Sequence, residues 1–271
     1  MDTDTGIELP DHKLPLVQSR VIRRLKALGL SDFRSYCDLV ESPEGTAERL
    51  ELLSVLTTNV TEFFREPHHF DYLCKHRIPV LCDHLRSGST VRVWSAGCST
   101  GEEAYSLMLA FLGEMPDIAD YDFKILATDI DPVVLKTAVR GLYSDSGIAR
   151  VPERLRKLYF EPSGDQIEHN QIFQSAKDIV VFRRLNLIDD WPLTRKFDVI
   201  MCRNVVIYFG DATKVKVWKR LAQHLQPDGL LFTGHSERLN GPAAELLQLV
   251  ATTTYQPNTG NTTPEGNDKC L

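Results

Sequence analysis

The sequence predicts an α/β fold: a mainly parallel sheet covered by helices, preceded by a small helical unit and interrupted by an antiparallel β-element. From residue 91 onward, short apolar runs alternate with amphipathic runs, which is typical of βα repeats. Residues 14 to about 75 have mostly helical periodicity. Between residues 141 and 182, about forty residues contain turn signals such as EPSGDQ and break the alternation.

Composition narrows the possible functions. The chain has 271 residues, is 42% hydrophobic and carries a formal net charge of −6, so it can fill a core but has no overall basic surface for nucleic acid. No apolar run is long enough for a membrane span, and the acidic start MDTDTGIELPD does not resemble a leader, so we expect a cytoplasmic protein. The six cysteines form no CxxC pair, and we expect neither a disulfide framework nor a bound metal.

The first segments are helical. LVQSRVIRRLKALGL places Val17, Val21, Leu25 and Leu28 on one face and ends at Gly29. SDFRSYCDLV and ERLELLSVL continue the pattern, which gives a helical N-terminal domain over residues 1–75. One connecting helix, roughly YLCKHRIPVLCDHLRSG, is expected to lead into the main domain.

The main domain is expected over residues 76–257, followed by a flexible polar tail over 258–271. Its predicted strands are VRVWSAG, FKILATDID, DIVVFRRLNL, FDVIMCRN and GLLFTG, and its predicted helices cover 101–112, 131–141 and 211–225. The antiparallel insertion is expected at about 155–182.

The turn after the first strand, GCSTGEE, is the natural place for a ligand, because parallel sheets bind outside the carboxyl ends of their strands. Its GxxxG spacing matches neither common phosphate-binding pattern, and Glu102 and Glu103 would repel a phosphate. The two acids can stabilise the helix dipole, or Glu103 can face a cofactor that carries positive charge. S-adenosylmethionine, with a sulfonium and an ammonium, fits the second reading.

An acidic residue at the end of the second strand supports the interpretation that a cofactor binds here. Asp129 ends the second strand, where acids of nucleoside-binding α/β folds accept hydrogen bonds from ribose hydroxyls. Asp129 or Asp131 can instead cap the helix that starts at Pro132, and Asp131 is the better placed of the two for a cap.

Five motifs together resemble the CheR-type chemotaxis receptor methyltransferases, which are protein-glutamate O-methyltransferases. These are TTNVTEFFREPHHF, WSAGCSTGEEAYSL, ATDID, CRNVVIYF and GHSERL, and the resemblance extends to about residue 257. It implies a Rossmann-like class I methyltransferase sheet with a helical N-terminal domain and a β-subdomain. Gly97 stands where the family commonly has alanine.

The resemblance also implies a set of site residues for S-adenosylmethionine and its product S-adenosylhomocysteine: Asn59, Thr61, Arg65, Gly97, Glu103, Asp129, Asn186, Leu187, Arg203 and Asn204. Arg65 would orient the acceptor, and Tyr208 would lie beside the transferring methyl group. Asn59 and Thr61 have a second reading, as caps of a helix beginning near Glu62. The acceptor glutamate is ionised at neutral pH and needs no general base, so His68, His69 and His235 are expected to be structural.

The implied partners are the cytoplasmic domains of chemoreceptors. Arg20, Arg23, Arg24 and Lys26 would dock them, although these residues can equally form a solvated helix face. The β-subdomain resembles one that binds a receptor C-terminal peptide in some members. Two other functions stay open: methylation of a small molecule or nucleic acid, and non-catalytic binding of the cofactor by a signalling module.

Overall fold

The N-terminal unit is a small helical bundle. The computed structural model describes residues 14–56, 59–164, 166–239 and 241–258, so most of the predicted tail and the first thirteen residues lie outside the described residues. Helices α2 (Leu14–Leu28), α3 (Phe33–Glu41) and α4 (Thr46–Leu56) are joined by short turns, one of them the 3-10 helix η2 (Pro43–Gly45). Val21 and Leu25 of α2 pack on Tyr36, as the periodicity predicts, but Leu28 is 39% exposed because the helix ends there.

The connecting region is two helices, where the sequence pattern predicts one. Helix α5 (Pro67–His76) stops at Arg77, and α6 (Ile78–Arg86) starts directly after it. Pro79 in the first turn of α6 has no N–H to donate to the carbonyl of Lys75, and its ring would clash with that carbonyl in a continuous helix, so the helix breaks between the two. Phe70 and Leu73 of α5 belong to the core of the sheet domain, so the packing favours a boundary ahead of α5 and not at residue 75.

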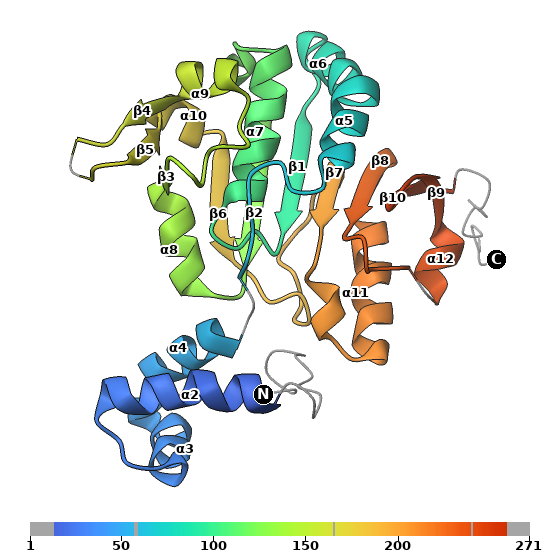
Figure 1. Ribbon diagram of the computed structural model, residues 1–271. Coiled ribbons are helices and arrows are strands. Elements are labelled where there is room, and N and C mark those ends of the chain that lie inside the picture. Colours follow the sequence, from blue (N-terminus) through green and yellow to red (C-terminus); the bar gives the residue numbers. More distant parts are fainter. Residues whose placement is uncertain (1–13, 57–58, 165, 240, 259–271) are drawn as a thin grey trace, which may run out of the picture.

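A seven-stranded sheet forms the main domain (Figure 1). Its order is β6-β2-β1-β7-β8-β10-β9, with bounds Val91–Ala96 for β1, Phe123–Asp129 for β2, Val180–Arg184 for β6, Phe197–Cys202 for β7 and Leu225–Thr233 for β8. These five strands are parallel, as predicted. β9 (Leu247–Ala251) and β10 (Thr254–Pro257) add an antiparallel edge that the sequence pattern does not predict.

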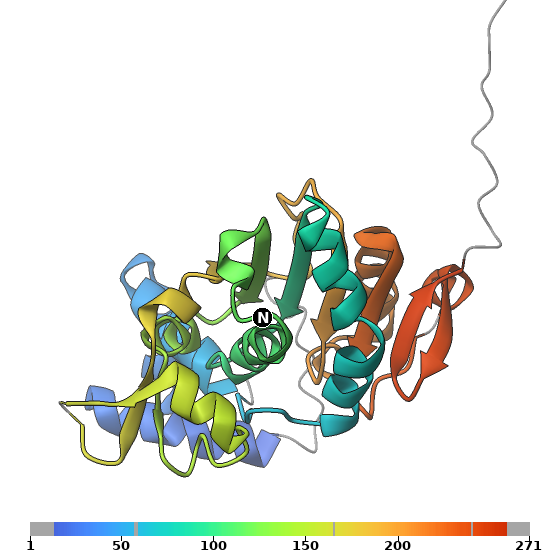
Figure 2. The same cartoon turned by 90° about the horizontal axis from the view of Figure 1, so that it is seen from above.

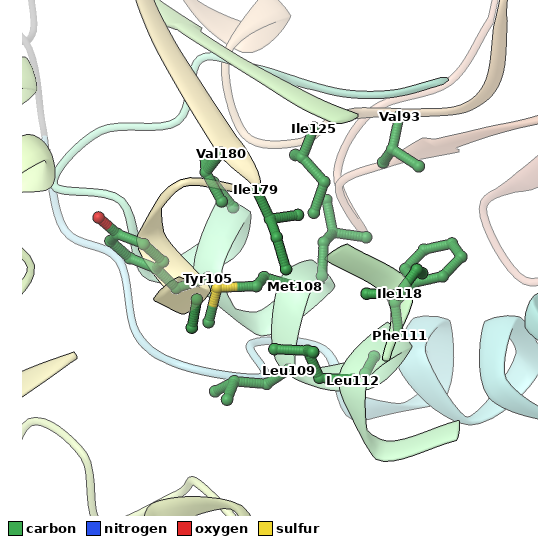
Figure 3. Close-up of a cluster of buried hydrophobic side chains, with 14 of the residues drawn as sticks. Val93, Tyr105, Met108, Leu109, Phe111, Leu112, Ile118, Ile125, Ile179 and Val180 are labelled. Carbon is green, nitrogen blue, oxygen red and sulfur yellow. The ribbon is translucent and has the colours of Figure 1, made fainter. Parts of the chain in front are cut away.

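Both faces of the sheet are covered, because alternate residues of each central strand point to opposite sides. Val91 and Val93 of β1 face the cluster built with α5, α6 and α7 (Glu102–Glu114), whereas Trp94 faces the cluster built with α11 (Asp211–Gln223). Figure 2 shows α7 and α11 on opposite sides of the sheet. Figure 3 shows the α7 side of the core, where Met108 and Phe111 lie among side chains of the strands.

The insertion is a three-stranded antiparallel sheet, as predicted, but it starts earlier. Its strands are β3 (Leu142–Ser144), β4 (Phe160–Pro162) and β5 (His169–Ile172), in the order β3-β5-β4. β3 directly follows α8 (Pro132–Arg140), and α9 (Glu153–Tyr159) and α10 (Gln174–Lys177) complete the element. Strand β6, part of which the predicted range 155–182 included, belongs to the main sheet.

The helical N-terminal unit lies at the carboxyl ends of the parallel strands of the main sheet. Figure 1 shows α2, α3 and α4 on the side of the sheet to which the arrowheads of β1 and β7 point. Within the part of the chain that the structure describes, no helix combines the length and apolar character needed to cross a bilayer.

Candidate functional site

A cavity of about 290 Å³ opens at the carboxyl ends of β1, β2 and β7, within reach of the size typical of ligand sites. Its lining comes mainly from six stretches of chain: the segment before α5, the turns after β1 and β2, the segment 185–187, and the loops after β7 and β8. Every residue predicted for the site lies in this lining: Asn59, Thr61, Arg65, Gly97, Glu103, Asp129, Asn186, Leu187, Arg203, Asn204 and Tyr208.

The turn after β1 forms the floor of the cavity. The backbone N–H groups of Gly97 and Cys98 both donate to the Thr128 carbonyl, at 2.8 and 2.9 Å, which ties the turn to the end of β2. Gly97 has a φ of +87°, and a Cβ added there would lie 2.2 Å from Cγ2 of Val205. Glycine is therefore required here both for its conformation and for close approach of the loop after β7.

The structure shows which of Asp129 and Asp131 caps α8 and which borders the cavity. Asp131 accepts from the Val133 N–H at 2.8 Å and so caps α8. Asp129 accepts from the backbone N–H groups of Ser99 and Asp131, at 2.8 and 2.9 Å, and borders the cavity. Burial raises the pKa of Asp129 above its usual range although these two hydrogen bonds oppose the shift. Each of its oxygens keeps a second lone pair for a donor in the cavity.

Glu103, and not Glu102, faces the cavity. Glu102 accepts from the Thr100 hydroxyl at 2.6 Å and lies outside the lining. Glu103 accepts from the Ser95 hydroxyl at 2.7 Å, and burial raises the pKa of its carboxyl despite the positive charge of Arg203 nearby. A cation placed in the cavity would lower that pKa and stabilise the ionised form.

Arg203 lies between two carboxylates and is almost completely buried, with a side chain that is 2% exposed. Its guanidinium is 3.6 Å from Glu103 and 3.8 Å from Glu66, and it donates to the Arg65 carbonyl at 2.5 Å. The ring of Phe70 lies 5.9 Å from the guanidinium carbon. These contacts fix Arg203 as a structural cation that joins the segment before α5 to the end of β7.

The segment 59–66 covers the cavity without forming a helix. Asn59 donates to the Asp131 carboxylate at 3.1 Å, and its carbonyl accepts from the Ser99 hydroxyl at 3.0 Å. Arg65 donates to the Val60 carbonyl at 2.9 Å. No helix begins near Glu62 in the described segment 59–66, so the alternative reading of Asn59 and Thr61 as helix caps there is wrong.

The loop after β7 supplies the opposite wall. Asn204 has a φ of +60°, and the 3-10 helix η4 (Val206–Tyr208) carries Tyr208 to the cavity. Asn204 lines the cavity, and its side-chain oxygen is buried with no hydrogen-bond partner among the described residues. Leu187 is 5% exposed and adds an apolar surface.

Three lining or supporting groups escaped sequence reasoning. Ser99 and His235 line the cavity, and Glu66 lies just behind it. His235 Nδ1 is 3.0 Å from the Glu66 carboxylate. Although burial opposes ionisation, this contact and the positive charge of Arg203 hold the pKa of Glu66 below its usual range. The motif GHSERL pointed to this loop, but only the tertiary structure brings it against Glu66.

One cluster has the composition of a metal site. Ligand atoms of Glu66, His68 and His69 all lie within 4.8 Å of one another. However, the guanidinium of Arg203 is 3.8 Å from the same Glu66 oxygen, and its charge disfavours a second cation there. His69 is fully buried and its Nε2 is 2.7 Å from the Thr253 hydroxyl, while burial and Arg203 lower its pKa to about 3.

The basic residues of α2 are not equivalent. Arg24 forms a two-pronged pair with Glu48, at 2.9 and 2.6 Å, and Arg20 donates to the Val55 carbonyl at 2.7 Å. Arg23 and Lys26 are exposed. Of the four residues predicted to dock receptors, Arg24 is therefore neutralised by Glu48, whose side chain is only 7% exposed. A hollow beside α2 is lined by Arg20, Arg23 and Arg24 and shares Asn59 and Val60 with the cavity.

Comparisons with known proteins agree with this geometry. Residues 59–256 match the family described as CheR methyltransferase, SAM binding domain, and residues 2–57 match CheR methyltransferase, all-alpha domain. The chain is 48% identical over 260 residues to a probable chemotaxis protein methyltransferase of Rhizobium etli, covering 95% of this chain and 96% of that protein. It is 40% identical over 238 residues to the chemotaxis protein methyltransferase of Escherichia coli, covering 87% and 80% of the two chains.

Proposed function

The chain belongs to the CheR methyltransferase family, and from this premise we propose how its cavity binds the cofactor and presents the methyl group to a chemoreceptor glutamate. The protein is an S-adenosylmethionine-dependent methyltransferase of chemotaxis, whose product is a glutamate methyl ester on chemoreceptors. We expect it to act in the cytoplasm, where the receptor signalling domains lie.

The lining of the cavity fits S-adenosylmethionine in both charge and hydrogen bonding. Asp129 would accept from the ribose hydroxyls, while Leu187 and Asn186 would border the adenine. Glu103 would face the ammonium group of the methionyl part, with Asn204 beside it. Arg65 would hold its carboxylate or orient the acceptor, and Asn59 and Thr61 would close the segment over the cofactor. The presence of all eleven predicted residues in the lining of one cavity is the observation that carries this assignment.

When bound, S-adenosylmethionine supplies an electrophilic methyl group on a positively charged sulfur. An ionised receptor carboxylate can attack that carbon directly, so the protein needs no general base. Its own residues would contribute alignment and exclusion of water, and proximity of the reactants can supply about 7–11 kcal/mol. Arg203 and Gly97 would shape the methyl-transfer side of the cavity, and Tyr208 would border the transferring methyl group.

Docking of the receptor would use the exposed cations of α2. Arg23 lines the hollow that shares Asn59 and Val60 with the cavity, and Lys26 follows it one turn later on α2, so an acidic receptor helix seated there would reach the site. Arg20 borders the hollow as well, whereas Arg24 would act mainly by holding α2 against α4 through Glu48. The strand β4 at one edge of the small sheet could take a receptor C-terminal peptide by strand addition.

Incubation with methyl-labelled S-adenosylmethionine and chemoreceptor membranes tests the proposal. We expect label in base-labile esters of the receptor, which Asp129→Asn and, separately, Arg23→Glu together with Lys26→Glu both reduce. Lys216→Glu together with Lys219→Glu, an exposed pair at the same spacing on α11, is a matched charge change away from the hollow and the β-subdomain and should leave the labelling unchanged. Label in nucleic acid or a small molecule, or cofactor binding without transfer, would replace this function by one of the alternatives.

A further inference from the structure

One buried carboxylate, Glu237, receives the backbone N–H groups of four consecutive residues. Its Oε1 accepts from Val205 at 3.0 Å, Val206 at 2.8 Å and Ile207 at 3.2 Å. Its Oε2 accepts from Asn204 at 2.8 Å. Glu237 follows β8, whereas its four donors follow β7, so the contact is purely tertiary.

The backbone of the donor loop explains why these groups converge. Asn204 is left-handed, with a φ of +60°, and Val205 is right-handed, with φ −113° and ψ −50°. Successive residues of opposite hand direct their N–H groups into a common concavity, which normally binds an anion. The anion here is a side chain of the same chain, 3% exposed.

Glu237 also stabilises the turn 234–237, which packs against the loop after β7. The Gly234 N–H donates to Oε2 at 2.7 Å, and the Glu237 N–H donates to the Gly234 carbonyl at 2.9 Å. A Cβ on Gly234 would lie 2.7 Å from the Asn204 side-chain nitrogen and 2.9 Å from the Glu237 carboxylate. The two loops therefore approach this closely only with glycine at that position.

The carboxylate has no ionic partner that could replace these bonds. Glu237 forms no salt bridge among the residues that the structure describes, so five backbone donors carry the stabilisation of its charge. Hydrogen bonds to an ionised acceptor are roughly twice as strong as neutral ones. Loss of the charge would weaken all five hydrogen bonds at once.

We infer that Glu237 is a positioning residue, which holds the loop 204–209 in the shape that forms the methyl-transfer wall of the cavity. That loop contributes Asn204, Val205, Ile207, Tyr208 and Phe209 to the lining, while the Glu237 side chain itself does not reach the cavity. The inference rests on the proposed function for its role in transfer, but its effect on cofactor binding does not depend on which acceptor is used.

Glu237→Gln tests the inference. The amide keeps one accepting oxygen but turns its NH2 group toward at least two of the backbone donors. We expect a dissociation constant for S-adenosylhomocysteine about tenfold higher by calorimetric titration, and a turnover number about 10- to 100-fold lower with receptor membranes, as misplacement by about 1 Å produces.

Asp198→Asn is the matched control. Asp198 is a carboxylate buried at the opposite end of β7, 7% exposed, and accepts from the Arg92 N–H at 2.8 Å. It should lower stability without changing cofactor affinity or turnover, when both variants are compared well below their unfolding temperatures.

The outcomes separate clearly. Unchanged affinity and turnover in Glu237→Gln, or equal losses in both variants, would overturn the inference. If Glu237→Gln does not fold, Glu237→Asp and Gly234→Ala are judged by the same criteria, since the first shortens the reach of the carboxylate and the second separates the loops. A wild-type protein that binds S-adenosylhomocysteine but methylates no receptor would refute the proposed function, and the titration would still decide the role of Glu237.

Discussion

Gly97→Ala tests the packing of the cavity floor, because the added methyl group should destabilise the fold in two separate ways, by backbone strain and by steric overlap. The backbone there has a φ of +87°, and the new Cβ would meet Val205 Cγ2 at 2.2 Å. A left-handed conformation costs an L-residue about 1–2 kcal/mol, and overpacking costs about 1–3 kcal/mol. We therefore expect the free energy of unfolding to fall by about 2–5 kcal/mol.

A second glycine provides a control for the cost of the left-handed backbone conformation. Gly88, between α6 and β1, has the same φ of +87° and no atom within 4 Å of an added Cβ. Gly88→Ala should therefore lose only the conformational part, and the difference between the two variants isolates the steric part. The entropic gain that accompanies any glycine-to-alanine change is common to both and cancels.

Urea unfolding of five proteins measures these values: wild type, Gly88→Ala, Gly97→Ala, Val205→Ala and the double variant Gly97→Ala with Val205→Ala. Wild type and the last three variants form a mutant cycle. The double variant should regain about 1–3 kcal/mol relative to additivity, because removal of Cγ2 relieves the overlap. Gly97→Ala should also weaken binding of S-adenosylhomocysteine, because a displaced Val205 enters the cavity. Equal losses in Gly88→Ala and Gly97→Ala, with no coupling to Val205, would refute the steric argument.

Three further predictions concern charged groups. Asp129→Asn should weaken S-adenosylhomocysteine binding by about 1.5–3 kcal/mol, measured by calorimetry, since one charge-assisted acceptor is lost; unchanged affinity would remove Asp129 from the site. The pKa of His69 is about 3 in the folded protein, below its usual 6.5. Below pH 6.5 the unfolded chain therefore binds a proton that the folded protein does not, and the contribution of neutral His69 to the free energy of unfolding is lost as the pH falls toward 3. Urea unfolding between about pH 6 and about pH 5 should lose about 1.4 kcal/mol per pH unit, and a His69→Gln variant that keeps the full slope would contradict this. Glu48→Gln should destabilise the N-terminal bundle by about 1–3 kcal/mol, because Arg24 loses its charged partner; hydrogen exchange of α2 and α4 that stays at the wild-type rate would show that the pair contributes little.

Much of the fold could be predicted because the central strands are short, apolar and regularly spaced. The carboxyl ends of parallel strands meet at one edge, so residues that end β1, β2 and β7 were expected to come together before any contact was known. The cavity lining includes all of them, from Gly97 to Arg203. Their individual roles toward the cofactor stay predictions.

The elements and contacts that the sequence did not predict were hidden for physical reasons. Strand β3 has three residues, too few for a period-two pattern, so the start of the insertion was not visible. β9 carries exposed Gln248 and Leu249 at the sheet edge, which hides its pattern. The break at Arg77 was accessible from Pro79, which cannot donate to the carbonyl four residues before it. Contacts such as Arg24 with Glu48, or Glu237 with the loop after β7, join distant segments and leave no local signal.

The position of β1 between β2 and β7 also constrains how the protein is made. Arg92 at the start of β1 donates its backbone N–H to Asp198 of β7, and the two are 106 residues apart. A ribosome that adds about 5–20 residues per second needs roughly 5–20 seconds to cover that distance. During that interval one edge of an apolar strand lacks its neighbour, whereas the N-terminal bundle, whose contacts are local, is already complete. Slowed translation of the intervening segment should therefore favour aggregation of nascent chains.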